Sequence, residues 1–243
     1  MRKLIFQNNQ IYHIYNRGVD KRIVFDSSKD YTTFLDYLAK CNKYKLAEDK
    51  NDDLHNDDEV NLKRKNPEKN KGEINKEDDP LVDILVFCLM PNHFHLLLRQ
   101  KIEGGITKFM QRVGTGYTMF FNSKEKRSGA LFQGRFKAVH VEEQKYFDYL
   151  IFYIHFNPLE LITGIIMENK EALIFLNEYE WSSHREYCFV KEMKDSMFLS
   201  NREFILSNFK NSKEYKKKAI EWMEILKTEN KDKDFNSIVI DFE

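Results

Sequence analysis

The spacing of hydrophobic residues divides the chain into short strands and amphipathic helices. Apolar and polar residues alternate from Gln10 to Asn16, in the sequence QIYHIYN, which predicts a strand. Apolar residues then recur every three or four positions after Ser27 and Ser28, which predicts a helix capped by one of these serines. The same criteria predict further strands at 81–89, 93–99 and 136–141, and further helices at 106–121, 142–156 and 212–228.

The order of these elements predicts the fold class. A strand, a helix, two strands, a helix, a strand and a further helix follow one another, which is typical of an α+β sandwich. We expect a mainly antiparallel sheet with its helices on one face, and the first six elements match the ferredoxin-like split β-α-β pattern. We therefore expect one domain over residues 1–195 and a helical C-terminal extension over residues 196–243.

A charged segment at 47–80 interrupts the predicted domain. It contains no aromatic residue and few aliphatic ones, so burial cannot offset its ordering entropy, and we expect a flexible insert. An acidic interaction arm is the alternative. The segment has 12 acidic and 7 basic residues, whereas the whole chain has 39 of each. The rest of the chain therefore carries a net charge of +5, which is compatible with binding a phosphate backbone.

Composition excludes several classes of protein. Hydrophobic residues make up 42% of the chain and aromatic residues 14%, enough to build a core, which argues against wholesale disorder. No apolar run approaches the roughly 18 residues of a membrane-spanning helix, so we expect no membrane partner. The N-terminal sequence lacks the apolar block of a signal peptide. The three cysteines lie in apolar sequence, which favours core thiols in a cytoplasmic protein.

Two histidines on one predicted strand are candidate metal ligands. His93 and His95 are two residues apart, so their imidazoles point to the same face of the sheet, while Phe94 points to the opposite face. Two imidazoles in this arrangement can hold one metal ion. The alternative is a pair of polar rings on a solvated sheet face.

The helix that follows the last strand carries a second group of candidates. Tyr153 and Asn157 are four residues apart, so they lie on one helical face, and Tyr146 and Tyr149 extend the same stripe. Tyrosines at this spacing commonly pack into a core with one exposed hydroxyl, which is the alternative. The amide oxygen of Asn157 could complete a metal site begun by two histidines.

The segments around these residues resemble a known family. Five segments carry the resemblance: CLMPNHFHLLL at 88–98, NRG at 16–18, FQGRF at 132–136, YIHFNP at 153–158 and WSSHREY at 181–187. Together they resemble the REP-associated tyrosine transposases and the insertion-sequence-200-like transposases, which are single-tyrosine HUH enzymes. The resemblance runs from about Ile11 to Tyr187 and is interrupted by the charged insert. It implies that Tyr153 is the catalytic tyrosine and that Asn157 is the third metal ligand, beside His93 and His95.

The resemblance also implies a reaction and a partner. It implies metal-dependent cleavage and rejoining of single-stranded, hairpin-associated DNA through a 5′-phosphotyrosine. The expected cofactor is a divalent ion, Mg²⁺ or Mn²⁺, and the expected assembly is a monomer or a homodimer. An alternative is a catalytically idle protein that binds DNA hairpins on the same fold. A plain RNA-binding module is disfavoured, because such modules present aromatic side chains for base stacking rather than paired histidines.

Four polar residues are candidate DNA contacts. Asn16 and Arg17 leave the first strand at a glycine turn, and simple turn chemistry is the alternative interpretation. Arg135 follows Gly134 and could bind a phosphate, unless it is only a surface arginine in a turn. Lys137 lies on the strand before the tyrosine helix, where it could also contact DNA.

Overall fold

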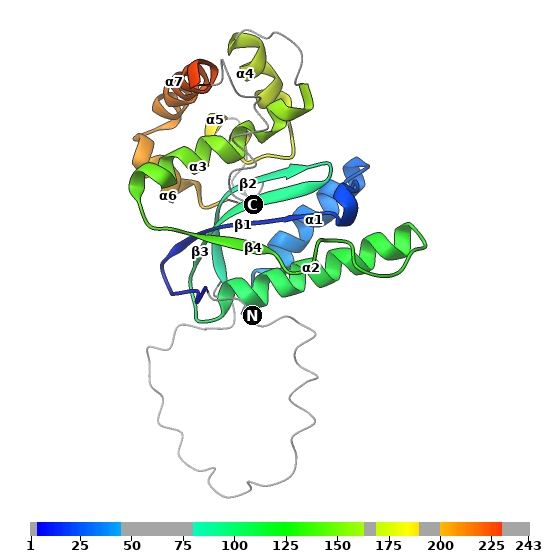
Figure 1. Ribbon diagram of the computed structural model, residues 1–243. Helices are drawn as coiled ribbons and strands as arrows, with labels where there is room; N and C mark the ends of the chain where they lie inside the picture. Colours follow the sequence, from blue (N-terminus) through cyan, green and yellow to red (C-terminus); the bar gives the residue numbers. More distant parts are fainter. Residues whose placement is uncertain (1–3, 45–79, 163–168, 190–199, 230–243) are drawn as a thin grey trace, which may run out of the picture.

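A four-stranded antiparallel sheet forms the centre of the protein. The computed structural model describes residues 4–44, 80–162, 169–189 and 200–229. The strands lie in the order β2-β3-β1-β4, and each neighbouring pair is antiparallel (Figure 1). Their bounds are Ile11–Arg17 for β1, Val82–Met90 for β2, His93–Gln100 for β3 and Lys137–Val141 for β4. This confirms the predicted α+β class, the antiparallel sheet and the ferredoxin-like order of elements.

The central strand β1 has two differently used faces. Tyr12 and Ile14 are buried in the core on one side of the sheet. His13 and Tyr15 lie on the other side, because side chains alternate along a strand. The register sets Tyr15 directly opposite His95 of β3. One sheet face is therefore mainly apolar, although Asn16 and Gln100 also lie on it, and the other is partly polar.

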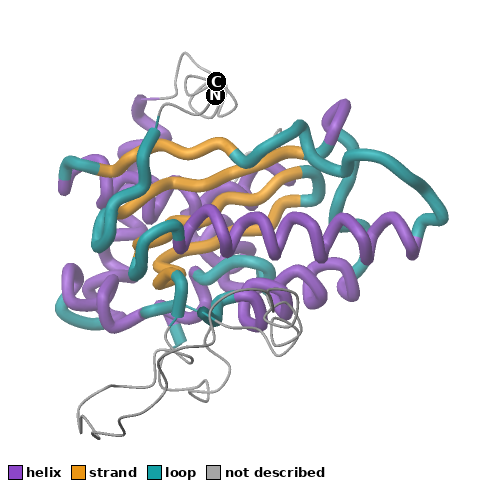
Figure 2. Tube along the Cα trace, turned by 90° about the horizontal axis from the view of Figure 1, so that it is seen from below, coloured by secondary structure: helices purple, strands orange, loops and turns teal. Residues whose placement is uncertain are grey.

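Helices cover both faces of the sheet, so the expectation of helices on one face is wrong. Helices α1 (Ser28–Cys41) and α2 (Gly105–Lys124) pack on the apolar face. Helix α3 (Gln144–Phe156) packs on the opposite face, and Figure 2 shows helices on either side of the strands. Hydrophobic spacing identifies the buried side of each helix but not the face of the sheet that it covers.

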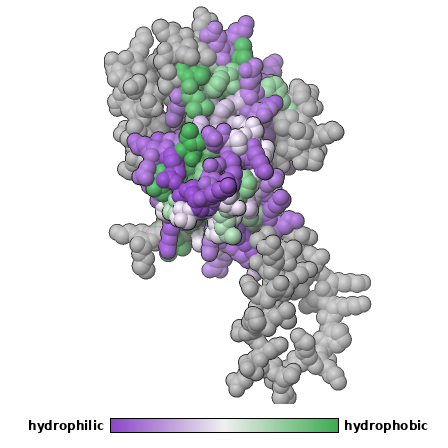
Figure 3. Space-filling view, turned by 90° about the vertical axis from the view of Figure 1, so that its right-hand side faces the viewer, coloured by the Kyte–Doolittle hydropathy of each residue, from purple (hydrophilic) through white to green (hydrophobic). Residues whose placement is uncertain are grey.

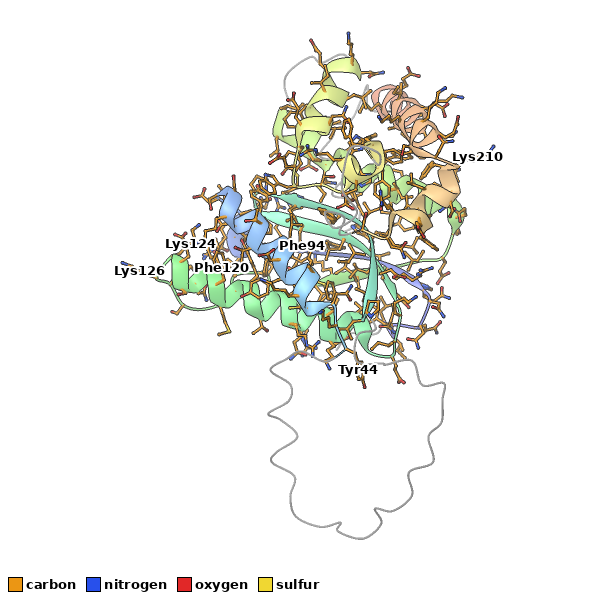
Figure 4. The ribbon with its side chains drawn as sticks, turned by 180° about the vertical axis from the view of Figure 1, so that it is seen from behind. Tyr44, Phe94, Phe120, Lys124, Lys126 and Lys210 are labelled. Atoms are coloured by element: carbon orange, nitrogen blue, oxygen red, sulfur yellow. The ribbon has the colours of Figure 1, made fainter. Side chains whose placement is uncertain are left out.

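Helix α1 begins at a capping box and is tied to the end of α2. The Ser27 side chain and the Asp30 carboxylate cap each other's backbone N–H groups, as the serine-rich start predicts. Lys124 donates to Asp30 at 2.8 Å, which joins the two helices. Figure 4 shows Lys124 at this end of α2 and Phe94 on the side of the sheet where α1 lies. Figure 3 views this end of the molecule and shows hydrophilic side chains gathered over it.

The C-terminal part of the chain is helical and packs onto α3. Its elements are η3 (Asn157–Ile162), α4 (Asn169–Glu178), α5 (His184–Cys188), α6 (Arg202–Phe209) and α7 (Ser212–Glu229). A short 3-10 turn, η1 (Val19–Lys21), follows β1. The predicted helix at 212–228 is confirmed, whereas the pattern did not resolve α4, α5 and α6. Side chains of α6 and α7 share one core with α3.

Three further expectations concern the cysteines, a membrane-spanning helix and the charged insert. Cys41, Cys88 and Cys188 are free and buried, as predicted for core thiols. Among the helices that the structure describes, none is both long and apolar enough to cross a membrane. The predicted insert covers residues 47–80, and of these only Pro80 belongs to the described residues.

Candidate active site

Strand β3 directs its two histidines to the face covered by α3. The His93 and His95 rings lie edge to face, with centroids 5.0 Å apart. Phe94 points the other way and packs against Phe34, with centroids 5.1 Å apart. The shared face predicted for the histidines is therefore confirmed, and the buried Phe94 fixes the strand against α1.

Helix α3 places Tyr153 over the histidines. The Tyr153 ring lies edge-on to His95 with centroids 5.8 Å apart, and edge-on to His13 at 6.2 Å. Tyr149 stacks against Tyr153 at 5.7 Å, so the tyrosine stripe is present as expected. Aromatic contacts on both sides hold the Tyr153 ring against the sheet, since such ring pairs prefer defined geometries.

Asn157, at the end of α3, completes the group. Its Oδ1 atom lies 3.2 Å from Nε2 of His93, and its Nδ2 donates to the carbonyl oxygen of Tyr153 at 3.0 Å. Asn157 is buried, with an exposed fraction of 2%. The fold thus brings together His93, His95, Tyr153 and Asn157, the four residues that the resemblance places in one site.

The surroundings of His93 suit a cation. Its Nδ1 lies 2.6 Å from Oδ1 of Asn92, and its Nε2 faces Oδ1 of Asn157. Burial lowers the pKa of His93 to about 4, with Asn157 raising it and Arg17 lowering it. The ring is therefore neutral at neutral pH and has one N–H for two facing oxygens. If Nδ1 donates to Asn92, the lone pair of Nε2 faces the Asn157 oxygen, and a bound cation would relieve this contact.

His95 supplies a second available nitrogen. Its Nε2 atom is buried and has no hydrogen-bond partner among the described residues. Its Nδ1 lies 2.9 Å from Nε2 of His13. Two imidazole nitrogens and one amide oxygen are a donor set that suits Mn²⁺ and is accepted by other divalent ions. Within the described ranges, no three His, Cys, Asp or Glu side chains form a metal-binding cluster, so this candidate site depends on the asparagine.

Two residues near the site were not singled out from the sequence. His13 contacts both His95 and Tyr153, but it lies 82 positions from His95, and only the pairing of β1 with β3 brings them together. Alternation along QIYHIYN places His13 on one face of a strand, which is the only signal that the sequence offers. Glu160 of η3 is half-buried, and its partial burial raises its pKa to about 6, while Arg17 lowers it.

The environment of Tyr153 opposes its ionisation. Burial raises its pKa above the ordinary value, the charges of Glu160 and Tyr149 add to this effect, and the side chain of Asn157 opposes it. Even in water, the phenol of a tyrosine has a pKa of about 10 and is therefore protonated at neutral pH. A nucleophilic role for Tyr153 would therefore require both removal of its proton and stabilisation of the charge that develops on the group it attacks.

The four predicted DNA contacts divide between the two faces of the sheet. Arg17 is paired with His93 in the sheet, and its Nε atom has no hydrogen-bond partner among the described residues. Lys137 pairs with Tyr15, and its ammonium group lies 5.8 Å from that ring. Both positions belong to the face that carries the histidines.

The other two predicted contacts lie toward α2. Asn16 is buried and donates to the carbonyl oxygen of Gly134 at 3.1 Å. Arg135 is exposed beside it, and both residues line a groove of about 1010 Å³ between α2 and the segment at 130–136. Asn16 therefore supports the Gly134 turn, where φ is 81°, rather than standing free at the surface.

Comparison with known proteins identifies a relationship over the segment that holds most of these residues. Residues 68–157 match the family profile described as "Transposase IS200 like". This segment is similar to the IS200-like transposases. The matched segment contains both histidines of β3, Tyr153 and Asn157. The match favours a DNA-processing protein of the transposase kind. His13 precedes it.

Two further comparisons add little to the IS200-like match. A solved structure described as "Structure of the REP associates tyrosine transposase bound to a REP hairpin" is 11% identical, with a TM-score of 0.44. The alignment covers 82% of this chain and 94% of that chain. A comparison with curated proteins by sequence finds no match.

Proposed function

We propose that this protein cleaves and rejoins single-stranded DNA, with Tyr153 as the nucleophile and a divalent ion held by His93, His95 and Asn157. One observation carries the proposal. Tyr153 contacts His95, whose Nε2 has no hydrogen-bond partner among the described residues, and the neighbouring His93 faces two amide oxygens with a single N–H. Buried polar groups without a protein partner are rare in folded proteins, and a bound ion is one way to satisfy them. The IS200-like match over the same residues supports the same reaction.

The chain's own residues account for the covalent step. The hydroxyl oxygen of Tyr153 forms a bond to phosphorus, and the bond from phosphorus to the 3′-oxygen of the preceding nucleotide breaks. Tyr153 loses its proton, the departing 3′-oxygen takes one up, and the 5′-phosphate stays attached to the tyrosine. Attack by a 3′-hydroxyl in the reverse direction rejoins the strand, so the phosphotyrosine conserves the bond.

The bound ion would supply electrostatic stabilisation of the charge that develops on the scissile phosphate. Arg17 and Lys137 lie on the same face and would hold the phosphates on either side of the cleaved bond. Asn16 and Arg135 would contact DNA only if the strand continues around the edge of β4 toward the groove. Mn²⁺ suits the mixed nitrogen and oxygen ligands better than Mg²⁺, although Mg²⁺ is the more available ion.

A catalytically idle hairpin-binding protein is the second candidate function. It would keep the fold and the basic side chains, but it would not need Tyr153 beside the histidine pair. The intact group of Tyr153, His93, His95 and Asn157 therefore favours the enzyme.

A direct assay separates the two candidates. The purified protein is incubated with end-labelled single-stranded DNA that contains a hairpin, with Mn²⁺ or Mg²⁺, and the products are run on a denaturing gel. The enzyme predicts a nicked strand and a covalent protein–DNA band that requires the metal. Tyr153→Phe should lose this band, whereas the matched variant Tyr149→Phe should keep it. DNA that is shifted in a native gel but never cut would contradict the proposed enzyme.

A further inference from the structure

A hydrogen bond between two histidines links β1 to the candidate metal site. The His13 and His95 rings stack with centroids 5.1 Å apart and planes inclined by 21°. Nε2 of His13 lies 2.9 Å from Nδ1 of His95. Both side chains are buried, with exposed fractions of 5% and 6%. Water therefore cannot readily take the place of either partner, and the bond restrains the His95 ring.

One proton occupies this hydrogen bond, and two arrangements are possible. If the proton is on Nδ1 of His95, then Nε2 of His95 carries a free lone pair. If the proton is on Nε2 of His13, then the N–H of His95 is on Nε2, where no acceptor lies among the described residues. Orphaned buried N–H groups are rarer in folded proteins than acceptors with an unused lone pair, so the first arrangement is favoured.

We propose that His13 is a positioning residue that accepts the Nδ1 proton of His95 and thereby keeps Nε2 of His95 unprotonated for a metal ion. The metal part of this inference rests on the proposed function. Histidine ligands usually donate their second N–H to a carboxylate, a backbone carbonyl or a water. A second imidazole takes that role here, and its stacked ring also fixes the plane of His95.

The first test uses the unmodified protein without metal. Long-range ¹H–¹⁵N spectra of the histidine rings distinguish a proton on Nδ1 from one on Nε2, and the His95 signals are assigned by their loss in His95→Gln. The proposal predicts that His95 carries its proton on Nδ1. A His95 proton on Nε2 would overturn the proposal, whatever the activity of the protein.

The second test uses two variants of similar size. The Gln side chain of His13→Gln can accept a hydrogen bond, whereas the side chain of His13→Met offers only a weak sulfur acceptor. The affinity for Mn²⁺, measured by titration calorimetry, should fall about 10-fold to 100-fold in His13→Met and stay within about threefold in His13→Gln. Unchanged affinity in His13→Met would overturn the proposal. An equal loss in both variants would also overturn it, because the acceptor would then not matter.

The two tests separate this inference from the proposed function. A wild-type protein that binds no Mn²⁺ and forms no DNA adduct would contradict the proposed function. The position of the His95 proton is read without metal or DNA, so it would still decide the role of His13. The same spectrum decides the matter if His13→Met does not fold.

Discussion

Two groups of histidines lie on opposite sides of α3, and they differ in how completely their nitrogens are bonded. The first group is the candidate metal site, with His13, His93 and His95 beside Tyr153. The second group joins α3 to the C-terminal helices through His155 and His184. All five histidines are buried or nearly so, so burial alone does not separate the groups.

The second group forms a continuous chain of hydrogen bonds that runs from Ser183 to Cys188. Nε2 of His155 lies 2.8 Å from Oγ of Ser183, and its Nδ1 lies 2.7 Å from the Tyr215 hydroxyl. The same hydroxyl lies 2.8 Å from Nδ1 of His184, whose Nε2 lies 3.3 Å from Sγ of Cys188. Each ring nitrogen has a partner, and neutral rings satisfy every bond in the chain.

The difference indicates which histidines are structural and which are available for chemistry. In the His155 group, Tyr215 of α7 fastens the helix that carries Tyr153 to the C-terminal helices. In the site group, Nε2 of His95 has no partner among the described residues, and His93 faces two amide oxygens. A satisfied network stabilises the fold, whereas an incomplete one keeps a nitrogen lone pair available to a ligand.

The largest expected effect is the loss of cleavage when a site histidine is removed. His93→Ala and His95→Ala should each lower adduct formation by at least about a hundredfold, the size typical of lost transition-state stabilisation. Hairpin binding should change little, because phosphate contacts made elsewhere supply most of the affinity. Gel assays of cleavage and binding measure the two effects separately. Normal cleavage by either variant in Mn²⁺ would show that the two-histidine site is wrong.

Acid should destabilise both groups. Burial lowers the pKa of His13 and His184 to about 3 and that of His93 to about 4, and it also lowers those of His95 and His155. The unfolded chain therefore binds protons that the folded chain does not, and stability falls as the pH decreases below about 6.5. Each buried histidine contributes up to about 1.4 kcal/mol per pH unit in this window.

Urea unfolding between pH 5 and pH 7.5 measures this loss. The free energy of unfolding should decrease by several kcal/mol in total, because several histidines act together. A free energy that stays constant over this range would mean that the rings become protonated in the folded protein, which would contradict their burial as neutral groups.

Breaking the hydrogen-bond chain of the second group should lower the free energy of unfolding but leave DNA cleavage in place. Tyr215→Phe leaves Nδ1 of both His155 and His184 without a partner, which should cost about 1–3 kcal/mol for each unsatisfied group. Folded protein should still form the DNA adduct at a rate within about threefold of the wild type, well below the hundredfold expected for a site histidine. Tyr37→Phe on α1, far from both groups, is the matched control. A Tyr215→Phe variant that is stable but inactive would place the second group in the reaction.

The smallest expected effect is at Cys188, the last residue of the hydrogen-bond chain. Cys188→Ser exchanges a weak sulfur donor for a hydroxyl at the His184 position, so the free energy of unfolding should change by less than about 1 kcal/mol. Thermal unfolding measured beside Tyr215→Phe tests this order of effects. A loss equal to that of Tyr215→Phe would indicate that packing around the sulfur, rather than the hydrogen bonds, stabilises the second group.

The sequence predicts the parts of the site that depend on local spacing. The pairs His93 with His95 and Tyr153 with Asn157 follow from the geometry of one strand and one helix. The contact of His13 with His95 depends on the register of β1 against β3, which the hydrophobic pattern does not contain. The side of the sheet covered by α3 and the link from Tyr215 to His155 are likewise long-range packing, so they emerge only from the structure.

Mapping the covalent adduct tests the central claim most directly. The protein is trapped on hairpin DNA in Mn²⁺ and digested, and the DNA-linked peptide is sequenced by mass spectrometry. Tyr117, Tyr146 and Tyr149 are the competing tyrosines, but Tyr117 is buried with its hydroxyl donating to Val24, and Asn157 contacts the backbone of Tyr153. The account predicts that the DNA is attached to Tyr153. Attachment to any other tyrosine would contradict it, even if the cleavage itself proved real.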